Sequence, residues 1–399
     1  MLRPVRDKLG PGMANNINEI NTALVLQKLW FSKGISRVEI SRELGLGKST
    51  VTHIVNALLK RNLVKAVRGG VSGPSGGRRP TELMINDRYG CILGLEIQTE
   101  FSKAVAIDLL GGIVFSHSEP IGFFQKDIES TFSEVIRKLE GKLDGIGLPL
   151  IGVGVGIAGI IDPYSGEILQ SNPLEIKEKT AFYRKAAGLL DVPVLIENDA
   201  NCCCWGELAF RKTQRHRNFL FVLGELRKGT TMGTEYWGIA VGMGMVLNGK
   251  VHYGEGFSSG EFQSILWNEP NHGQFSISDE DSKRIEADKE VRSGVIGELS
   301  SHIAFLVNIL NLTSVVIGGE IIKYRDEIVP VLRKEIQKNW SYPNQVECSI
   351  EFATMGDMAV AYGAAGMFLE RFFSIPEIAD GPARKPTGIG ALSGREGKG

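Results

Sequence analysis

Three consecutive polar residues follow a short apolar run at the centre of the chain. Glu197, Asn198 and Asp199 come directly after residues 192–196, which predict a buried strand, and a helical pattern begins after them. In an open α/β sheet, ligands bind beyond the carboxyl ends of the strands. A carboxylate beside an amide suits a polyol, because the carboxylate accepts hydrogen bonds and the amide both donates and accepts them. The alternative is that Asn198 and Asp199 only cap the helix.

A second functional pattern lies near the N-terminus. Apolar residues at helical spacing predict helices at 17–31, 37–44 and 49–60, and a Gly-Leu-Gly turn separates the last two. This order is that of a helix-turn-helix. Two predicted strands, 63–67 and 82–85, follow it and are joined by a Gly/Ser-rich loop with arginines at both ends. Together these elements predict a winged helix-turn-helix.

The third predicted helix and the wing carry residue types that bind DNA. Side chains on the outer face of the helix that can donate and accept hydrogen bonds at base edges are Ser49, Thr50, Thr52, His53 and Asn56. The residues placed to meet phosphates are Lys48, Arg61, Arg68, Arg78 and Arg79. Residues 15–81 hold eleven Lys and Arg against three Glu, so we expect double-stranded DNA as a partner. The alternative is a solvated, charged face of a packing domain.

Length and composition narrow the class of protein. A chain of 399 residues with a net charge of −1 is too long for one core, so two or three domains are expected. Three of the five cysteines are consecutive, at 202–204, a spacing that fits neither a disulfide framework nor a C-x₂-C zinc site. We expect a reduced, cytoplasmic protein. No apolar stretch long enough for a membrane span and no signal peptide is expected.

From residue 87 the pattern becomes α/β. A predicted hairpin at 91–97 and 103–108 leads to a strand at 113–117, a helix at 128–143 and a buried strand at 150–161. This order recurs loosely in strands at 218–223 and 238–247, a helix at 300–312 and a strand at 314–317, which suggests two related lobes around a cleft. We expect a DNA-binding domain at 15–86, a first lobe at 87–200, a second lobe at 201–373 whose last helix returns to the first, and a disordered tail at 374–399.

Four motifs in combination resemble the ROK family of repressors and sugar kinases. They are G-G-R-R-P at 76–80, G-V-G-V-G-I-A-G-I-I-D at 152–162, E-N-D-A-N at 197–201 and G-E-F at 260–262. The resemblance covers residues 18–373. It implies an N-terminal winged helix followed by a two-lobed, actin-like (ribonuclease H-like) sugar-kinase fold. Family members with such a winged helix resemble xylose- or N-acetylglucosamine-type repressors, whereas the kinases usually lack it.

The family's phosphate and zinc motifs are altered here. The kinases' Asp-x-Gly-Gly-Thr turn matches E-I-Q-T-E at 96–100, which lacks both glycines and ends on Glu100, a carboxylate that would repel a phosphate. Their Gly-Thr-Gly loop matches G-I-A at 238–240. Ser264 stands where the family's zinc-binding histidine lies, and no cysteine lies between residues 204 and 348. We therefore expect no metal, no cofactor and no kinase activity.

The sugar-binding residues of the family are retained. The resemblance matches Asp199 to the kinases' general base, Asn198 to its sugar-contacting neighbour and Glu261 to a sugar-binding glutamate. Asn172 and the turn at Gly159 are weaker candidates, and Glu261 could instead be a surface acid on a turn. The sequence retains Asp199 but lacks both phosphate-binding turns of the kinases. This combination predicts that the protein binds a sugar without phosphorylating it.

These observations predict a sugar-responsive transcriptional regulator, a repressor of carbohydrate-utilisation genes. As a homodimer it would place two third helices in successive major grooves of a palindromic operator. Two alternatives remain open at this point. One is an ATP-dependent sugar kinase with an accessory DNA-binding domain. The other is a constitutive DNA-binding or scaffold protein whose cleft is vestigial.

Overall fold

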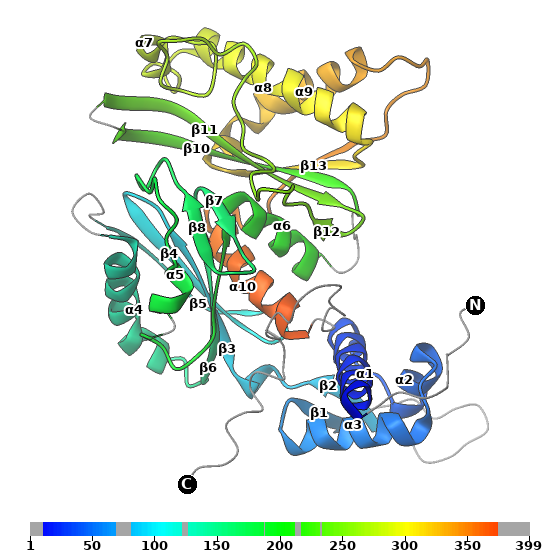
Figure 1. Cartoon of the computed structure of the whole chain (residues 1–399). Helices are drawn as coiled ribbons and strands as arrows, with labels where there is room; N and C mark the ends of the chain where they lie inside the picture. Colours follow the sequence, from blue (N-terminus) through cyan, green and yellow to red (C-terminus); the bar gives the residue numbers. More distant parts are fainter. Residues whose placement is uncertain are drawn as a thin grey trace. The chain divides into compact units, whose positions relative to one another are not determined.

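The computed structural model describes residues 11–68, 81–121, 127–186, 188–211, 217–231 and 234–373. These residues form two compact units (Figure 1). Unit 1 contains the described residues up to Gly90, a short turn at Asp108–Gly112 and residues 369–373, and unit 2 contains the rest of the described chain. Most of the predicted wing loop and the predicted tail at 374–399 lie outside the described residues.

Unit 1 consists of three helices followed by a pair of antiparallel strands. The helices are α1 (Pro11–Phe31), α2 (Arg37–Leu44) and α3 (Lys48–Lys60); the strands are β1 (Val64–Arg68) and β2 (Thr81–Ile85), followed by the short helix η1 (Asp87–Tyr89). The predicted order of two helices, a glycine turn, a third helix and two strands is therefore present.

Local chemistry fixes both ends of α2. The Ser36 hydroxyl accepts a hydrogen bond from the backbone N–H of Glu39, and the Glu39 carboxylate accepts one from the Ser36 N–H at 2.9 Å. This reciprocal capping satisfies two donors that the first turn of a helix leaves free. Gly45 ends the helix with φ 65°, a left-handed conformation that glycine adopts without steric cost. Gly47 then caps α3, so the Gly-Leu-Gly sequence sets the turn.

The core of unit 1 is formed largely by apolar residues at helical spacing. Its fully buried side chains include Leu26, Leu29, Trp30, Ile40, Val55, Leu58 and Leu83. Two residues that fit the spacing lie outside this core: Ile17 is 43% exposed, and Leu59 is half-buried. Helical spacing defines a stripe of residues but not its edges. The ring of Phe373, near the end of the described chain, packs on Trp30 with centroids 5.1 Å apart.

Unit 2 contains two five-stranded sheets with the same strand order. The first sheet is β5-β4-β3-β6-β9 and the second sheet is β12-β11-β10-β13-β14, so each reads third, second, first, fourth, fifth in its own chain order. The strands of the first sheet are β3 (Cys91–Ile97), β4 (Phe101–Asp108), β5 (Ile113–Pro120), β6 (Leu150–Ile157) and β9 (Val194–Asn198). Those of the second are β10 (Phe219–Thr231), β11 (Thr234–Leu247), β12 (Lys250–Val251), β13 (Ser314–Gly319) and β14 (Ser349–Phe352). The repeated topology confirms the predicted pair of related α/β lobes.

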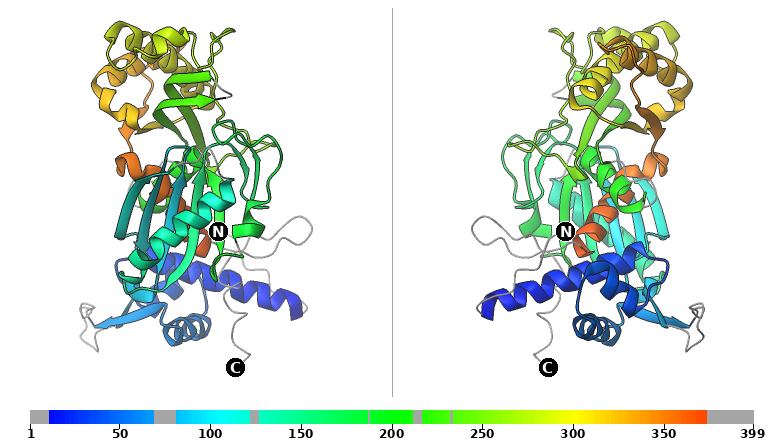
Figure 2. Two further views of the ribbon diagram at one scale, coloured as in Figure 1. Left: turned by 90° about the vertical axis from the view of Figure 1, so that its left-hand side faces the viewer. Right: turned by 90° about the vertical axis from the view of Figure 1, so that its right-hand side faces the viewer.

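Helices cover the sheets on both faces. They are α4 (Ile128–Asp144), α5 (Phe182–Ala186), α6 (Asp199–Phe210), α7 (Asp279–Ser282), α8 (Lys289–Leu310), η2 (Glu320–Tyr324), α9 (Arg325–Lys338), η3 (Gly356–Met358) and α10 (Ala359–Phe373). Helices α8 and α9 cover one face of the second sheet (Figure 2), and α6 and α10 pack on its other face. Helix α9 and strand β14 were not predicted from the sequence.

The predicted single strand at 150–161 was wrong. It is two strands, β6 and β7 (Ile160–Asp162), and β7 pairs with β8 (Glu167–Gln170) in a small hairpin. Gly159 separates them with φ 135°, and a Cβ atom there would lie 2.4 Å from the carbonyl oxygen of Gln170. The chain therefore turns at Gly159, and the apolar run continues in another sheet.

The alternating glycines and valines of β6 have a packing cause. Val153 and Val155 face the core beneath α4, whereas the glycines between them face α10. A Cβ atom on Gly154 would lie 2.1 Å from the carbonyl oxygen of Ala364, and one on Gly94 of β3 would lie 1.9 Å from that of Ala361. Only glycine allows the α10 backbone to lie this close to the sheet.

The three consecutive cysteines are core residues of α6. All three are free, buried thiols, packed with side chains from β10 and α10. Burial raises the pKa of each thiol well above its ordinary value. They therefore act as small apolar residues, as the spacing predicted.

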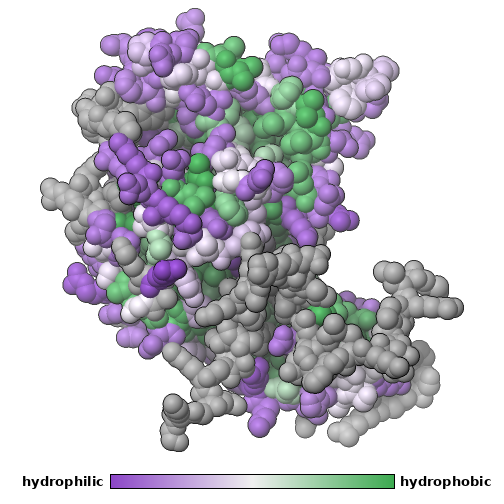
Figure 3. Space-filling view, in the orientation of Figure 1, coloured by the Kyte–Doolittle hydropathy of each residue, from purple (hydrophilic) through white to green (hydrophobic). Residues whose placement is uncertain are grey.

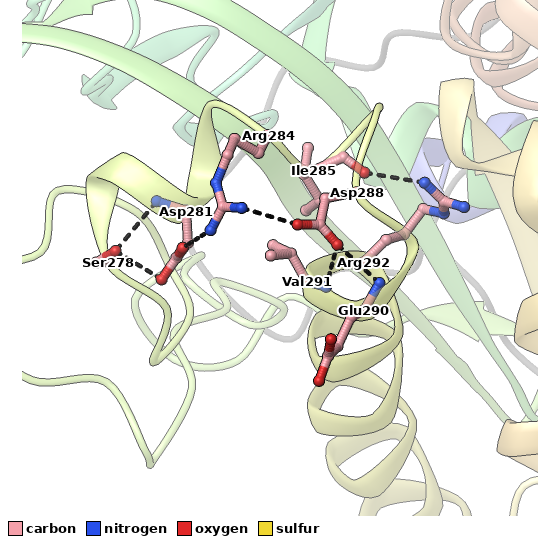
Figure 4. Close-up of polar contacts among 8 residues, drawn as sticks. All are labelled: Ser278, Asp281, Arg284, Ile285, Asp288, Glu290, Val291 and Arg292. Carbon is pink, nitrogen blue, oxygen red and sulfur yellow. Dashed lines mark hydrogen bonds and ion pairs between the residues drawn. The ribbon is translucent and has the colours of Figure 1, made fainter.

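Helix α8 begins eleven residues earlier than predicted, because a polar cluster fixes its start (Figure 4). The Asp288 carboxylate accepts hydrogen bonds from the backbone N–H groups of Glu290 and Val291 at 3.0 and 3.3 Å. Arg284 pairs with Asp288 at 2.9 Å and also with Asp281. Such a cap is difficult to find by periodicity, because the first turn of α8 is charged.

Helix α8 is also long and apolar enough, by length and composition alone, to cross a membrane. The expectation that no such stretch exists was therefore wrong. Its inner face, with Val295, Leu299 and Ile303, belongs to the core of the second sheet.

Candidate functional site

The polar triplet lies where β9 ends and α6 begins. Asn198 is the N-cap of α6: its Oδ1 accepts a hydrogen bond from the backbone N–H of Asn201 at 3.0 Å. Its Nδ2 donates a hydrogen bond to the carbonyl oxygen of Gly159, also at 3.0 Å. The predicted cap is present, and the same side chain joins β9 to the turn between β6 and β7.

Asp199 lies in the first turn of α6 with 5% of its surface exposed. One carboxylate oxygen accepts a hydrogen bond from the N–H of Ala200 at 2.8 Å, and the other accepts one from Nε2 of Gln98 at 3.5 Å. An anion is favoured at this helix N-terminus, where the backbone dipoles point their positive ends at it.

Glu197 is fully buried and accepts hydrogen bonds from four donors. Three are nearby in sequence: the Asn198 N–H at 2.9 Å, Asn201 Nδ2 at 3.3 Å and Trp205 Nε1 at 3.3 Å. The fourth is the hydroxyl group of Tyr253 at 2.7 Å. A buried carboxylate with this many donors is a structural group that orients its neighbours.

Glu261 belongs to a turn that docks on β11 beside Asp199. Gly260 adopts φ 98°, and its carbonyl oxygen accepts a hydrogen bond from the N–H of Met243 at 3.1 Å. Glu261 pairs with Gly242, and a Cβ atom on Gly242 would lie 3.7 Å from Asp199 Oδ1. Although Glu261 is exposed, partial desolvation and the Asp199 carboxylate raise the pKa of its side chain. The two carboxyl groups therefore share one environment.

The two weaker candidates lie on the β7–β8 hairpin. Gly159 precedes β7, and Asn172 follows β8 in an exposed turn. The carbonyl oxygen of Asn172 accepts a hydrogen bond from the N–H of Glu175. The Ser171 hydroxyl donates to the carbonyl oxygen of Ala158 at 2.6 Å, which fixes the two ends of the hairpin together. The fold thus brings the predicted residues of the first lobe to one end of the first sheet.

Residues 98–100 form the turn between β3 and β4, and the chain's own side chains fill it. Gln98 is 5% exposed, and its Nε2 donates to Glu96 Oε1 at 3.3 Å as well as to Asp199. Its Oε1 accepts a hydrogen bond from Arg227 of β10 at 3.4 Å. Gln98 therefore links the two sheets through Arg227.

Two buried carboxyl groups lie around this glutamine. Burial raises the pKa of Glu96 to about 7, opposed by the nearby ammonium group of Lys103, and it raises the pKa of Glu225 to about 8. Residues 238–240 are ordinary members of β11, paired with residues 225–227 of β10. They form no loop.

Ser264 is buried, and its hydroxyl lies 3.0 Å from Nε2 of His302 on α8. Within the described parts of the chain, no group of three or more His, Cys, Asp or Glu side chains is arranged to hold a metal ion.

In unit 1, the predicted DNA-reading residues lie together on α3. All of them are exposed except Thr50, which is half-buried, and Lys48 and Arg61 at the ends of the helix are also exposed. The Thr52 hydroxyl donates to the carbonyl oxygen of Lys48 at 2.8 Å, and Asn56 Oδ1 accepts a hydrogen bond from Arg37 at 3.2 Å. Arg68 is the last residue of β1. Arg78 and Arg79 lie outside the described residues.

Comparison with known proteins finds similarity to one family. The sequence profile of the ROK family matches residues 94–274. The xylose repressor of Bacillus spizizenii is 26% identical over 394 residues, covering 90% of this chain and 97% of the relative. The xylose repressor of Caldicellulosiruptor bescii is 25% identical over 412 residues, covering 91% of this chain and 98% of the relative. The chain is therefore similar to ROK family proteins.

Solved structures are similar to this chain in fold. A ROK family transcriptional regulator, described as a homologue of the E. coli MLC protein, superposes with a TM-score of 0.71 at 17% identity, covering 88% of this chain and 96% of that one. A ROK family glucokinase from Streptomyces griseus, in complex with glucose and AMPPNP, superposes with a TM-score of 0.53 at 18% identity. That match covers 70% of this chain and 99% of the glucokinase. The two-lobed fold expected from the resemblance is therefore confirmed.

Sequence reasoning missed the roles of Glu197 and Gln98 at this site. Glu197 was visible in the polar triplet, but its buried role depends on Tyr253, which no local pattern connects to it. Gln98 stood in the altered phosphate motif, yet its contacts with Asp199 and Arg227 come from three separate elements. The one sequence signal that could have identified Glu197 is a carboxylate placed between an apolar run and a helix cap.

Proposed function

We propose that this protein is a sugar-responsive, DNA-binding transcriptional regulator that represses carbohydrate-utilisation genes and acts in the cytoplasm. The observation that carries the proposal is the presence of two sites in one chain. The exposed polar face of α3 follows a capped helix and a glycine turn. Asn198 and Asp199 lie at the end of β9, and Glu261 pairs with Gly242, which lies beside Asp199. Similarity to xylose repressors along nearly the whole chain supports it.

The effector site suits a neutral sugar. Asp199 accepts hydrogen bonds, the Asn198 amide is held in place by Gly159 and the backbone of α6, and Glu261 adds a second carboxyl group beside Asp199. Groups fixed in this way discriminate between sugars, because a buried polar group left without a hydroxyl partner is costly. Xylose is the first candidate, since the curated relatives are named xylose repressors.

We propose further that the site does not transfer phosphate. Phosphate-binding turns need free backbone N–H groups and room for the anion. Here the Gln98 side chain fills the first turn, the second is a paired strand, and two buried carboxyl groups lie beside them. The alternative, an ATP-dependent sugar kinase, is favoured only by the retention of Asp199.

A ligand changes DNA affinity only if it binds two conformations differently. We propose that the sugar favours a closed arrangement of the two sheets of unit 2. Because the helix-turn-helix precedes β3 in the same chain, closure would alter the spacing of two such modules in a dimer.

An exposed apolar surface on α8 supports the dimer. His302, Phe305 and Ile309 share one face of the helix, and the Ser264 contact with His302 brings Ile265 and Leu266 beside them. Four of these side chains are strongly exposed: Ile265 86%, Leu266 58%, Phe305 61% and Ile309 66%. Figure 3 shows hydrophobic surface over this helix. A second copy is the occupant we propose, because a two-fold axis lets one apolar helix face pack on its equivalent.

The test is a thermal-shift screen of the full-length protein against xylose, other sugars, sugar phosphates and ATP with magnesium. A ligand that binds only the folded state raises the Tm of the protein, and the stabilisation grows with the logarithm of the ligand concentration relative to its Kd. We expect a shift with one neutral sugar, none with ATP, and loss of that shift in Asn198→Ala and Asp199→Ala. A clear ATP shift would favour the kinase. A DNA affinity that no sugar changes would favour the constitutive DNA-binding or scaffold protein.

A further inference from the structure

Three aromatic rings lie next to the candidate sugar site and have no part in the function proposed above. Tyr164, Tyr253 and Phe257, here called the aromatic triad, have ring centroids 5.8–6.2 Å apart in edge-on or tilted contacts. Tyr164 lies in the β7–β8 hairpin of the first lobe, and the other two lie in the segment after β12 of the second. The triad is therefore assembled from both lobes of unit 2.

Both segments that carry the triad also carry candidate sugar-binding residues. The β7–β8 hairpin begins after Gly159 and ends before Asn172, and the segment after β12 ends at Glu261. The N–H of Ser259 donates to the carbonyl oxygen of Tyr253 at 3.1 Å, which ties the Glu261 turn to the triad. A ligand held by the sugar site thus has the aromatic triad as its neighbour.

Hydrogen bonds fix the Tyr253 ring and the turn that carries Tyr164. The Tyr253 hydroxyl donates a 2.7 Å hydrogen bond to Glu197, the residue before Asn198. The backbone N–H of Tyr164 donates to Asp162 Oδ1 at 2.9 Å, and the Ser165 hydroxyl donates to the other oxygen of the same carboxylate at 2.7 Å. Groups that are already ordered lose little conformational entropy when a ligand binds to them.

Two features single out this cluster from ordinary packing. Tyr164 is 49% exposed, so much of its ring remains open although it packs on two other rings. Phe257 adopts φ 61°, a left-handed conformation that a bulky side chain rarely occupies. Such strain persists only where surrounding structure maintains it, and it concentrates at ligand-binding sites.

The surrounding charges disfavour an anionic ligand. The carboxylates of Asp162, Glu197 and Glu261 all lie in the segments that hold the triad or contact it. A phosphate or carboxylate group would be repelled there. The face of an aromatic ring is instead electron-rich and attracts polarised C–H groups, such as those on the apolar face of a sugar ring.

We propose that the aromatic triad is a second carbohydrate subsite, which stacks on a neutral sugar ring linked to the ring held by Asn198, Asp199 and Glu261. The preferred effector is then a disaccharide or longer oligosaccharide. This inference rests on the proposed function, because it requires that the first site binds a sugar.

Calorimetric titration of the full-length protein with two matched pairs, xylose with xylobiose and glucose with cellobiose, tests the subsite. In the pair that binds, the disaccharide should bind about three- to tenfold more tightly, the range that one aromatic stacking contact provides. Tyr164→Ala should reduce the disaccharide affinity to that of the monosaccharide. Tyr164→Phe, which keeps the ring, and Tyr342→Ala, which removes a tyrosine that is 63% exposed elsewhere, should preserve the difference.

The outcomes separate this inference from the proposed function. A wild-type protein that binds the monosaccharide at least as tightly as the disaccharide overturns the subsite and leaves the proposed function intact. A preference for the disaccharide that survives Tyr164→Ala overturns the assignment to the triad. If neither pair binds, and no other sugar shifts the Tm, the proposed function fails and the subsite fails with it.

Discussion

The side-chain amide of Asn198 donates a hydrogen bond to the carbonyl oxygen of Gly159 across 39 residues of sequence, at 3.0 Å, while its oxygen caps α6. One side chain thus fixes the helix start and the turn beside it. We predict that Asn198→Asp keeps the cap but loses the donor, whereas Asn198→Ala loses both and is less stable by about 1 kcal/mol. Urea unfolding measures the stability, and both variants should lose the sugar-induced Tm shift. An unchanged shift in Asn198→Asp would show that the amide does not support the site.

The contact between β6 and α10 predicts a strong effect from a single methyl group. Because a Cβ atom on Gly154 would lie 2.1 Å from a backbone carbonyl oxygen, Gly154→Ala should destabilise the protein by at least about 1–3 kcal/mol. Gly141→Ala is the matched control, since a Cβ atom there meets nothing within 4 Å on the exposed side of α4. That change should be neutral or stabilising, because alanine favours helix. Equal urea midpoints for the two variants would contradict the packing described here.

The buried carboxyl groups predict how stability depends on pH. Burial raises the pKa of Glu96 from 4.5 to about 7 and that of Glu225 from 4.5 to about 8. At a pH between 4.5 and the raised value, each group keeps its proton in the folded state but has released it in the unfolded state. The free energy of unfolding should therefore fall as pH rises from about 4.5 to 8, by up to about 1.4 kcal/mol per pH unit for each group. Glu96→Gln should flatten this slope in urea titrations, and exposed Glu140→Gln should not. A slope that Glu96→Gln leaves unchanged would assign the effect to other groups.

Asn56 on α3 and Arg61, the residue directly after that helix, should separate base reading from phosphate contacts. Arg61→Ala should weaken operator binding for all sequences alike and reduce the slope of log K against log salt by about one. Asn56→Ala should cost about 1–3 kcal/mol and relax specificity at one base pair. Fluorescence anisotropy over a salt series measures both, with Lys334→Ala on α9 as the control. Equal responses from all three variants would argue against α3 as the reading helix.

The apolar surface on α8 predicts a concentration-dependent dimer. A charged side chain in that surface would have to be buried against the second copy, so Phe305→Glu should yield monomers in sedimentation-velocity experiments. Val38→Glu, at a residue that is 63% exposed on α2, is the matched control and should leave the dimer intact. The surface is excluded if Phe305→Glu remains dimeric.

Local sequence determined the positions of several helices, turns and strands in this protein. Helix periodicity, the Gly-Leu-Gly turn and the polar triplet after a buried strand located the helix-turn-helix and the β9–α6 junction, because these signals act over a few residues. A helix cap at Asn198 or Asp199 was likewise predicted from residue type, and the structure places it at Asn198. The repeated strand pattern pointed to two related lobes, and the shared strand order confirmed them.

Tertiary structure decided the rest, because the deciding contacts join residues that are distant in sequence. The alternation of glycine and valine in β6 predicts a strand, but only the position of α10 shows why every second residue must be glycine. The role of Glu197 depends on Tyr253, and the aromatic triad exists only because the β7–β8 hairpin meets the segment after β12. Local patterns specify which surfaces are apolar or polar, whereas the topology selects which of those surfaces meet.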